Sequence, residues 1–588
     1  SEETVKRYYG DRISELEMLL AEEKAKQGGG DKGTTRDLET AIKGLRKRFD
    51  RILAWLKESS DKNIPFEKTG IDALLIDEAH AYKRAPIVTR MQRIKGIPNG
   101  ESARAMDLMM KVRHVQEKMK GRNVILATGT PVTNTFAEVY VMMNIIAPKV
   151  LEGYGIHSFD DFAATFAIKE DKTEYTWAGT WKRITRMARF VNGRVLSTMI
   201  RNVFDVKMGN KELGLDVPDI EGGKPEEVIV EQTPANEAWS RMLDEIAANY
   251  MSLQGKEKKT FSYIPILTMQ TGMAAALDPR LVDPQAPDHK GSKVNKAVDR
   301  ILSIWKEGAE RKSTQIVFAD RFANMDTEKL GAFVHGNLSL SAEDEEKGTE
   351  EEGADEGGDE EKSALSKRED EEYKNAKFNL YHDIKNKLIA LGVPEKEIAI
   401  IHDYKASKKR DKLFEDMNAG NVRILLGSTE KLGIGVNVQE RLAAVHHLDP
   451  PRMMTPAMDE QRNGRIIRQG NMHAAKVGDQ DGWNIPVKIL RYGTANSMDT
   501  GIYQMLETKS KAVVQALKGQ MSEDEFDDPA DEVTRSFAVM KALSTGDTRV
   551  LRNVELEDTI RKLRLSREGF LNERGAAVRK LGDFRLAV

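Results

Sequence analysis

The first 60 residues carry apolar side chains at helical spacing in two arms. In the second arm the apolar residues recur at alternating steps of four and three, which places one stripe on a helix: Leu38, Ile42, Leu45, Phe49, Ile52 and Leu56. Ile13, Leu16 and Leu20 supply a matching stripe in the first arm, and the run GGGDKG at 28–33 predicts a turn between the arms. The pattern predicts a helical hairpin over 11–58. The hairpin either packs on itself as an antiparallel coiled-coil insertion or extends as an arm that contacts a partner.

From residue 71 onward the pattern changes to short, continuous apolar runs separated by polar loops and helical stretches. Two runs come first, at 71–76 and 124–127, and a second set follows at 315–319, 398–401, 422–426, 443–448 and 487–490. Strands that are apolar throughout, rather than at every second position, are typical of parallel sheets covered on both faces. The runs therefore predict an α/β fold with two parallel-sheet lobes.

The remaining segments divide the chain around these two lobes. We expect a helical hairpin insertion at 1–60, the first lobe at 61–150, a helical insertion region at 151–290, the second lobe at 291–515 and a helical tail at 516–588. Within the second lobe, residues 342–372 are dominated by glutamate and aspartate. Such a segment buries too little apolar surface to offset its ordering entropy, so we expect a disordered acidic insertion. The alternative is a nucleic-acid mimic that occupies a basic channel.

Composition narrows the class of protein. The 588 residues include 91 basic and 94 acidic ones, so the net charge of −3 gives no global electrostatic signature of a nucleic-acid binder, although a local basic channel stays open. The chain has no cysteine, which excludes disulfides and thiolate metal sites and fits a reducing compartment. No apolar run approaches the roughly 20 residues that span a bilayer. We therefore expect a cytoplasmic protein with no membrane partner.

Two carboxylates, Asp77 and Glu78, follow the first apolar run directly in the segment DEAH. The carboxyl edge of a parallel sheet is where α/β proteins bind ligands. In nucleotide hydrolysis, Asp77 would hold Mg²⁺ through its water shell and Glu78 would orient the attacking water. His80 would couple this site to neighbouring motifs. Taken alone, the four-residue segment also fits chance or the start of a helix.

Two further segments place hydroxyls and glycines directly after predicted strands. LATGTPVTN at 126–134 is suited to switching hydrogen bonds between the lobes, and GSTEKLGIGVN at 427–437 lets backbone approach a phosphate or sugar closely. Each segment also fits an ordinary junction or loop. The candidate nucleotide-binding residues in them are Thr128, Gly129, Thr130, Gly433, Gly435 and Asn437.

The segment QRNGRIIRQG at 461–470 spaces Arg465 and Arg468 three residues apart, on one face of a predicted helix. Two guanidiniums there could reach across a cleft to a γ-phosphate as arginine fingers, a role that lysine fills poorly. Gln461 opens the segment and is a further candidate for nucleotide binding. The competing interpretation is a solvated basic turn of helix. Four such motifs in this order, each beside a predicted strand, are a stronger signal than any one alone.

The ordered set DEAH, TGTPVTN, STEKLGIGVN and QRNGRIIRQG resembles the helicase core of superfamily two, most specifically the Swi/Snf-type translocases of double-stranded DNA. The resemblance covers roughly residues 60–515 and implies two RecA-like lobes with helical insertions. It also implies ATP and Mg²⁺ as ligands, double-stranded DNA as partner, and ATP-driven tracking along the duplex. The resemblance also implies that Asp77 and Glu78 are the Mg²⁺ and water residues and that Arg465 and Arg468 are the arginine fingers. It implies that Thr128 and Thr130 belong to the motif that couples the lobes.

Within that group, the wording LIDEAHAYKR, LLGSTEKLGIGVNVQERL, HHLDPP and GRIIRQGN resembles a phage and mobile-element branch. Its members often adjoin an adenine-specific DNA methyltransferase in one polypeptide, as in DarB-like antirestriction proteins. This resemblance implies a role in DNA modification or antirestriction and a methyltransferase domain as partner. It also implies the cytoplasm of a bacterial host, or a phage virion, as the location.

One expected motif is missing. The phosphate-binding loop of the family, G-x-x-x-x-G-K-[ST], does not occur in the 588 residues, and GGKP at 222–225 is no substitute because proline follows the lysine. We therefore expect that the loop lies upstream of Ser1, that the first lobe is incomplete at its N-terminus, and that another segment supplies its missing strand. The alternative is a catalytically inactive assembly or virion-packaged protein. A strand-separating helicase or restriction-type motor is a third interpretation.

Overall fold

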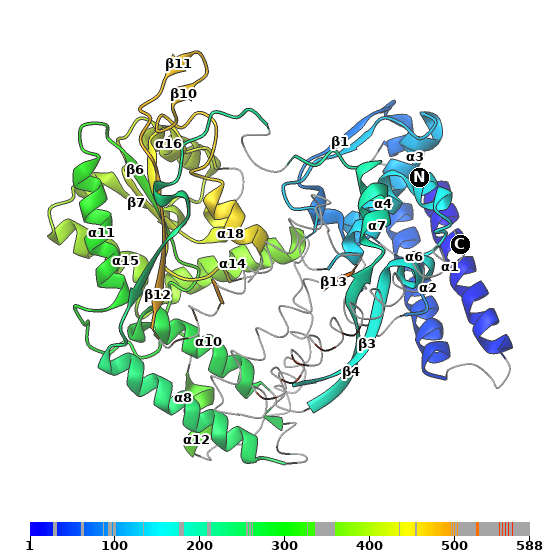
Figure 1. Ribbon diagram of the computed structural model, residues 1–588, viewed down its shortest axis with the longest axis horizontal. Helices are drawn as coiled ribbons and strands as arrows, with labels where there is room; N and C mark the ends of the chain where they lie inside the picture. Colours follow the sequence, from blue (N-terminus) through cyan, green and yellow to red (C-terminus); the bar gives the residue numbers. More distant parts are fainter. Residues whose placement is uncertain are drawn as a thin grey trace, which may run out of the picture.

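The computed structural model describes most of the chain up to residue 503. Outside the described residues lie 27–31, 60–63, 86, 92–93, 95–96, 98–101, 133–134, 176–180, 208–212, 255–256, 258–259, 262, 326, 336–358, 434–435, 453–455, 496, 498, 500–501, and all of 504–588 except 525–527 and single positions at 552, 556, 559, 563 and 567. Figure 1 shows two lobes side by side. Lobe one, on the right, is formed by the N-terminal residues, and lobe two, on the left, by the residues from about 220 onward.

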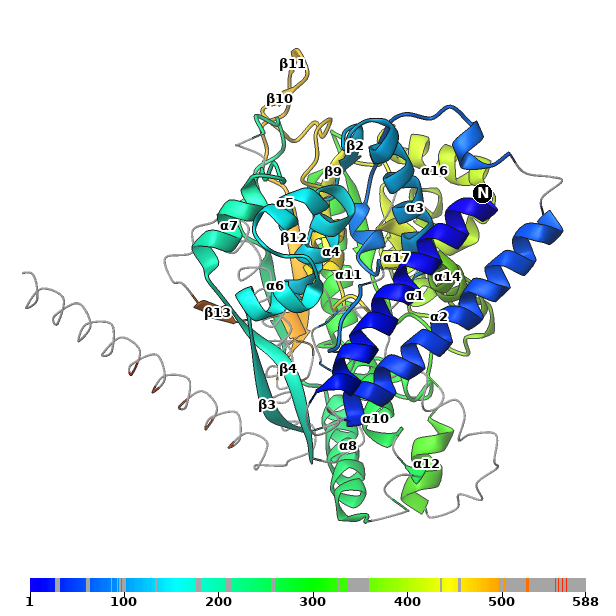
Figure 2. The same ribbon diagram turned by 90° about the vertical axis from the view of Figure 1, so that its right-hand side faces the viewer.

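The N-terminal hairpin consists of α1 (Glu2–Ala25) and α2 (Lys32–Ser59), which lie side by side (Figure 2). The predicted stripes form their contact, and the most buried members are Leu16, Leu38, Ile42 and Leu45. The predicted helical hairpin is therefore confirmed. It does not pack only on itself, because Tyr9 of α1 is fully buried in a core that the hairpin shares with lobe one.

Lobe one is mostly helical around a small sheet. Its elements are η1 (Phe66–Lys68), β1 (Leu74–Ile76), η2 (Ala79–Tyr82), α3 (Ala103–Lys118), β2 (Val124–Leu126), α4 (Ala137–Ile146), α5 (Pro148–Gly153), α6 (Phe159–Phe166) and α7 (Gly193–Arg201). β1 and β2 are parallel, with Leu75 opposite Ile125. Leu74 and Leu126 pack on the helical core, whereas Leu75 is 77% exposed and Ile125 58% exposed on the other face. Among the described residues, this sheet therefore has one apolar face that no layer covers.

A long antiparallel strand pair extends from lobe one. β3 (Ala167–Tyr175) pairs with β4 (Trp181–Val191), and β13 (Glu525–Asp527) pairs with the other edge of β4. The helical insertion region expected at 151–290 therefore also contains this strand pair, and the expected helical tail at 516–588 contains a strand. Phe190 is buried in the lobe-one core, and Arg189 forms a cross-strand ion pair with Glu170 at 3.0 Å. Such opposite-charge pairs stabilise neighbouring strands. The rest of the predicted tail lies almost entirely outside the described residues.

Lobe two is built on a six-stranded parallel sheet in the order β5-β12-β9-β6-β8-β7. The strands are β5 (Glu226–Val230), β6 (Thr314–Phe318), β7 (Ile398–Ile400), β8 (Ile424–Gly427), β9 (Leu442–His447) and β12 (Lys488–Thr494). All five strands predicted for this lobe are present. β5 is an addition within the region expected to be a helical insertion. It is an edge strand, and only Val228 of its sequence EEVIV is buried.

Helices cover both faces of this sheet, as the continuous apolar strands predicted. Successive residues of β6 illustrate it: Val317 lies in one apolar core and Phe318 in the other. The first core includes α10 (Ile264–Leu277), α11 (Lys293–Glu307) and α15 (Leu380–Ala390), and the second includes α16 (Ser407–Asn418) and α17 (Thr429–Leu432). The α/β fold with two lobes and a parallel sheet is therefore confirmed.

The remaining elements connect or flank these layers. They are η3 (Glu221–Gly223), α8 (Pro234–Ser252), η4 (Pro279–Leu281), α12 (Glu328–His335), α14 (Asp359–Asn375), η6 (Glu395–Glu397), η7 (Ile401–Asp403), α18 (Pro456–Asn463), β10 (Lys476–Val477) and β11 (Gln480–Asp481). α14 corrects the expectation of disorder at 342–372. Residues 336–358 lie outside the described part, but 359–372 are helical, and Glu369 is only 4% exposed. Contacts with lobe two supply the ordering energy that composition alone did not suggest.

Candidate functional site at the strand ends of the two lobes

Asp77 and Glu78 lie at the rim of lobe one, directly after β1, and both side chains are exposed. Asp77 Oδ1 accepts the N–H of Glu78 at 2.8 Å, and Glu78 takes left-handed backbone with φ of 50°. The turn is fixed to the end of β2 because the N–H of Ala79 donates to the carbonyl of Ala127 at 2.9 Å. A left-handed glutamate costs roughly 1–3 kcal/mol, and such strain concentrates at functional sites. The turn therefore presents two carboxylates in a fixed backbone conformation.

His80 joins this turn to the next motif. It is buried, and its Nδ1 lies 3.1 Å from Thr128 Oγ1 and 3.2 Å from Glu78 Oε2. Thr128 Oγ1 in turn accepts the N–H of Thr130 at 3.1 Å. The structure thus brings together His80 and the two threonines that the sequence picked out, while Gly129 lies exposed between them. A movement of the Glu78 carboxylate or of the Thr128 hydroxyl would therefore change a contact of the His80 imidazole.

The corresponding loop of lobe two follows β8. Ser428 caps α17 by accepting the N–H of Lys431 at 3.3 Å. A Cβ added to Gly433 would lie 2.4 Å from the carbonyl of Thr429, so only glycine fits this close turn. Asn437 is exposed, whereas Gly435 lies outside the described residues.

Arg465 and Arg468 do not lie on a helical face, because α18 ends at Asn463 and Gly464 follows. Arg465 donates to the carbonyls of Gly433 and Val436 at 2.6 and 2.7 Å. Arg468 donates to the same Val436 carbonyl at 3.4 Å. Both guanidiniums therefore hold the loop after β8. Their predicted role toward a phosphate stays a prediction, as does that of the partly buried Gln461.

The two lobes interact electrostatically at these motifs. Burial lowers the pKa of Arg465, the neighbouring Arg468 lowers it further, and the Glu78 carboxylate opposes both, giving a pKa of about 10. Glu78 belongs to lobe one and Arg465 to lobe two. The Glu78 carboxylate is therefore near enough to act on the charge of Arg465 in the other lobe.

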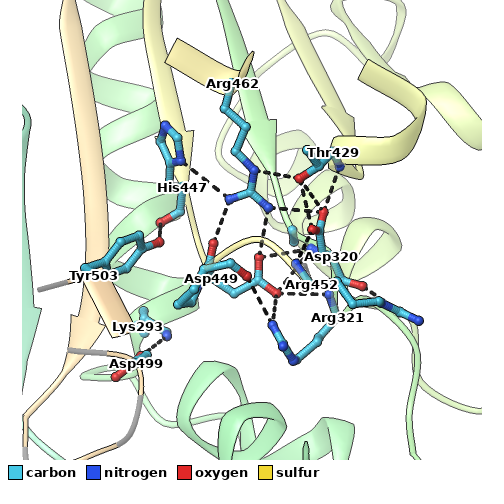
Figure 3. Close-up of polar contacts among 12 residues, drawn as sticks. Lys293, Asp320, Arg321, Thr429, His447, Asp449, Arg452, Arg462, Asp499 and Tyr503 are labelled. Atoms are coloured by element: carbon cyan, nitrogen blue, oxygen red, sulfur yellow. Dashed lines mark hydrogen bonds and ion pairs between the residues drawn. The ribbon is translucent and has the colours of Figure 1, made fainter. Parts of the chain in front are cut away.

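Sequence reasoning missed Arg462, a buried arginine at the centre of a cluster of polar contacts in lobe two (Figure 3). It is fully buried, and its Nε donates to Thr429 Oγ1 at 2.7 Å. Its other nitrogens reach the carbonyl of Asp449 at 2.7 Å and the carboxylate of Asp320 at 3.1 Å. Asp320, Thr429 and Asp449 follow β6, β8 and β9 respectively. One guanidinium thus ties together three strand ends.

The charges in this cluster stabilise one another. Burial alone would raise the pKa of Asp320, but the Arg462 guanidinium and the N–H groups of Thr429 and Arg452 outweigh it, so the pKa is lowered. Asp449 accepts the N–H of Arg321 at 3.0 Å and its guanidinium at 3.1 Å. The sequence does contain a signal for this cluster, because Asp320 in VFAD and Asp449 in HHLD each follow an apolar run. The sequence alone gave no reason to pair these aspartates with an arginine.

Lobe one offers oxygen donors suited to magnesium. In the part of the chain that the structure describes, no group of three or more histidine, cysteine, aspartate or glutamate side chains could hold a metal ion by itself. Mg²⁺ typically uses one or two carboxylates together with water and substrate phosphates. The exposed carboxylate of Asp77 fits that manner of binding. Across the same described ranges, no helix has the length and apolar character to cross a membrane.

Two protein-family models match the chain. Residues 1–208 match a probable helicase domain, and residues 372–470 match a helicase conserved C-terminal domain. The chain thus carries helicase-family segments in both lobes. A stretch of 112 residues is 32% identical to "Defense against restriction protein B" of Escherichia phage P1, which is 18% of this chain but only 5% of that protein's length.

Among solved structures, the Sulfolobus solfataricus SWI2/SNF2 ATPase core in complex with dsDNA aligns over 84% of this chain and 74% of its own, at 13% identity and a TM-score of 0.30. The Pyrococcus furiosus Hef helicase domain aligns over 74% and 73%, at 12% identity and a TM-score of 0.31.

Proposed function

We propose that this chain is the motor part of an ATP-dependent translocase or helicase that acts on double-stranded DNA. The observation that carries the proposal is the placement of a motif after a parallel strand in each lobe: Asp77 and Glu78 follow β1, and Arg465 holds the loop that follows β8. A site divided between two lobes links nucleotide turnover to their relative movement. The helicase-family matches in both lobes support the same conclusion.

Each lobe would contribute a different part of ATP hydrolysis. Asp77 would hold Mg²⁺ through water, and the ion, when bound, would neutralise charge on the phosphates. Glu78 would orient the attacking water. His80 would pass the state of this site to Thr128, 3.1 Å away. Arg465 and Arg468 would turn from the loop carbonyls toward the γ-phosphate when the lobes close.

The uncovered face of the lobe-one sheet supports the expectation of a further segment. Leu75 and Ile125 lie opposite each other in the strand pair and point to the same exposed side. We propose that a strand and helix carrying the phosphate-binding loop complete this sheet, either from the same polypeptide or from a partner. The chain alone would then bind ATP weakly, and micromolar ATP affinity in a filter-binding assay would contradict this part of the proposal.

The biological setting we propose is phage or mobile-element DNA modification or antirestriction. The 112-residue similarity to a phage protein named for defence against restriction supports it. A methyltransferase domain in the same polypeptide, and a place in the bacterial cytoplasm or the virion, would fit that setting.

The test is ATP hydrolysis by the full native polypeptide with and without duplex DNA. Glu78→Gln should lower the DNA-stimulated rate by about 10²–10⁴-fold, because the group that orients water loses its charge. Glu152→Gln, at another exposed glutamate of lobe one, should leave the rate unchanged. An ATP hydrolysis rate that duplex DNA does not change, or that Glu78→Gln does not lower, would contradict the proposed motor function.

A second candidate is a non-catalytic assembly or virion-packaged protein that keeps the two-lobed fold. The observation in its favour is the absence of the phosphate-loop motif from the sequence, together with the engagement of Arg465 on loop carbonyls. Absence of ATP turnover by the full native polypeptide under all DNA conditions would favour this candidate.

A further inference from the structure

Helix α14 arises from the acidic stretch and lies against the strand-end loops of lobe two. It contacts α17, the short helix that follows β8. Figure 1 shows α14 beside α18, on the side of lobe two that faces lobe one. The carboxyl ends of parallel strands are where α/β proteins bind their ligands. α14 therefore covers a part of the sheet edge where a ligand is expected.

The first contacts are made with the loop that follows β8. Lys431 is nearly buried, and its Nζ lies 3.2 Å from the Asp370 carboxylate and donates to Ser366 Oγ at 2.6 Å. Ser428 Oγ donates to Glu369 at 2.9 Å. A lysine, a serine hydroxyl and nearby backbone form a set that suits a phosphate as well as a carboxylate. On α14, carboxyl groups meet all of these donors.

The second contact is with the segment that follows β9. Arg452 donates to the Glu372 carboxylate at 3.2 Å, and its own N–H donates to Asp320 at 2.7 Å. The side chain of Arg452 is 31% exposed and that of Glu372 29% exposed. Lys431 follows β8 and Arg452 follows β9, which lie on either side of β6 in the sheet, and each cation is paired with a carboxylate from one helix.

The ion pairs of α14 with Lys431 and Arg452 could be exchanged for contacts with another anion. The Arg452–Glu372 pair is partly exposed, and such pairs contribute little to stability, so a stronger anion can replace it. In the second pair only Asp370 is partly exposed, since Lys431 is 6% exposed. Glu369 is an unfavourable neighbour for this edge, because burial and the nearby Asp320 raise its pKa to about 8. At its C-terminal end the helix is anchored by Tyr373, whose hydroxyl donates to Asp403 at 2.7 Å and whose ring stacks on His402. Asp370 and Glu372 lie in the same helical turn as Tyr373, so giving up their ion pairs would require the helix to tilt about this anchor.

We propose that α14 competes with DNA for lobe two: Asp370 and Glu372 occupy the positions on Lys431 and Arg452 that phosphates of the duplex backbone would take. The inference rests on the proposed function, since it takes double-stranded DNA as the ligand of this edge. DNA binding would then require α14 to give up its two ion pairs, which restrains the motor until a duplex is present.

The test is duplex-DNA binding by the full chain, measured by fluorescence anisotropy over a range of salt. Glu372→Gln should tighten binding by about 3- to 10-fold, because Arg452 no longer has to exchange a carboxylate for a phosphate. Asp370→Asn should act in the same direction through Lys431. The matched control is Glu371→Gln, which removes the same charge from the adjacent, exposed position of the helix.

Glu372→Asp, which keeps the charge, should bind like the original chain. If Glu372→Gln and Asp370→Asn bind duplex DNA no more tightly than Glu371→Gln, the competition is overturned, whatever the ATPase assay gives. If they bind more tightly, the competition stands even where the full polypeptide fails to hydrolyse ATP. The two proposals therefore fail by different measurements.

Discussion

Replacing Arg462 with methionine would remove the cation at the centre of lobe two while keeping a long side chain. Arg462 is fully buried, bonds Thr429 and the carbonyl of Asp449, and lies 3.1 Å from the Asp320 carboxylate. Its guanidinium also lies over the ring of Phe318, 5.1 Å from the centroid. Removing one partner of a buried ion pair costs about 3–5 kcal/mol, because the other charge stays buried without compensation.

The remaining hydrogen bonds decide where in that range the loss falls. Asp320 would still accept the N–H groups of Thr429 and Arg452, both at 2.7 Å. Asp449 would keep its contacts with Arg321. These bonds partly compensate the carboxylates, so we expect a loss of about 3 kcal/mol, near the lower end of the range. That is a large share of the roughly 5–15 kcal/mol by which a typical protein is stable.

Urea unfolding followed by tryptophan fluorescence would measure the loss, since Trp305 and Trp483 report on lobe two. The control is Arg468→Met, which removes a partly buried arginine with one long hydrogen bond and should cost less than about 1 kcal/mol. The double variant with Asp320→Asn should lose less than the sum of the single losses, since it removes both charges. A loss no greater than that of Arg468→Met, or simple additivity, would refute the reasoning.

Three further predictions concern pH, the exposed strand face and the loop after β8. Burial lowers the pKa of His446 to about 3 and of His473 to about 4, so the unfolded chain, with values near 6.5, binds more protons. Between pH 7 and pH 5 each histidine should reduce stability by about 2 kcal/mol, whereas Glu369, whose pKa is raised to about 8, acts in the opposite direction. A His446→Gln variant whose stability changed with pH over that window as steeply as that of the original chain would contradict the histidine contribution. Leu75→Ser should leave the melting temperature unchanged but reduce self-association in sedimentation; a marked loss of stability would mean that the face is already covered. Gly433→Ala should destabilise lobe two by about 1–3 kcal/mol because its Cβ meets a backbone carbonyl, whereas Gly129→Ala, with open space around it, should be neutral in the same thermal scan.

Sequence pattern predicted the elements whose environment is uniform along their length. The five strands predicted for lobe two are largely buried on both faces, so each contains a run of apolar residues that is visible without knowledge of its neighbours. β5 and the β3–β4 pair were not predicted because their sequences EEVIV and AIKEDKTEY contain neither a continuous apolar run of about four or more residues nor a regular apolar–polar alternation. α14 escaped because its order depends on Lys431 and Arg452, which lie more than 50 residues away in the chain.

The candidate site was predicted in the same uneven way. Asp77, Glu78 and His80 were found because they follow one strand without interruption, and the structure joins His80 to Thr128 as expected. Arg462 was passed over in favour of Arg465, its neighbour in the same motif. What distinguishes it is burial against aspartates that come from two other strands, and no local spacing encodes that.

The pairing of β13 with β4 brings the chain back to lobe one after it has formed lobe two. The backbone leaves lobe one after α7, enters lobe two at β5, and returns to lobe one at residues 525–527. The chain therefore connects the two lobes twice, between α7 and β5 and between Tyr503 and β13. A single break in either connection would leave the lobes joined through the other, so the products of limited digestion can count the connections.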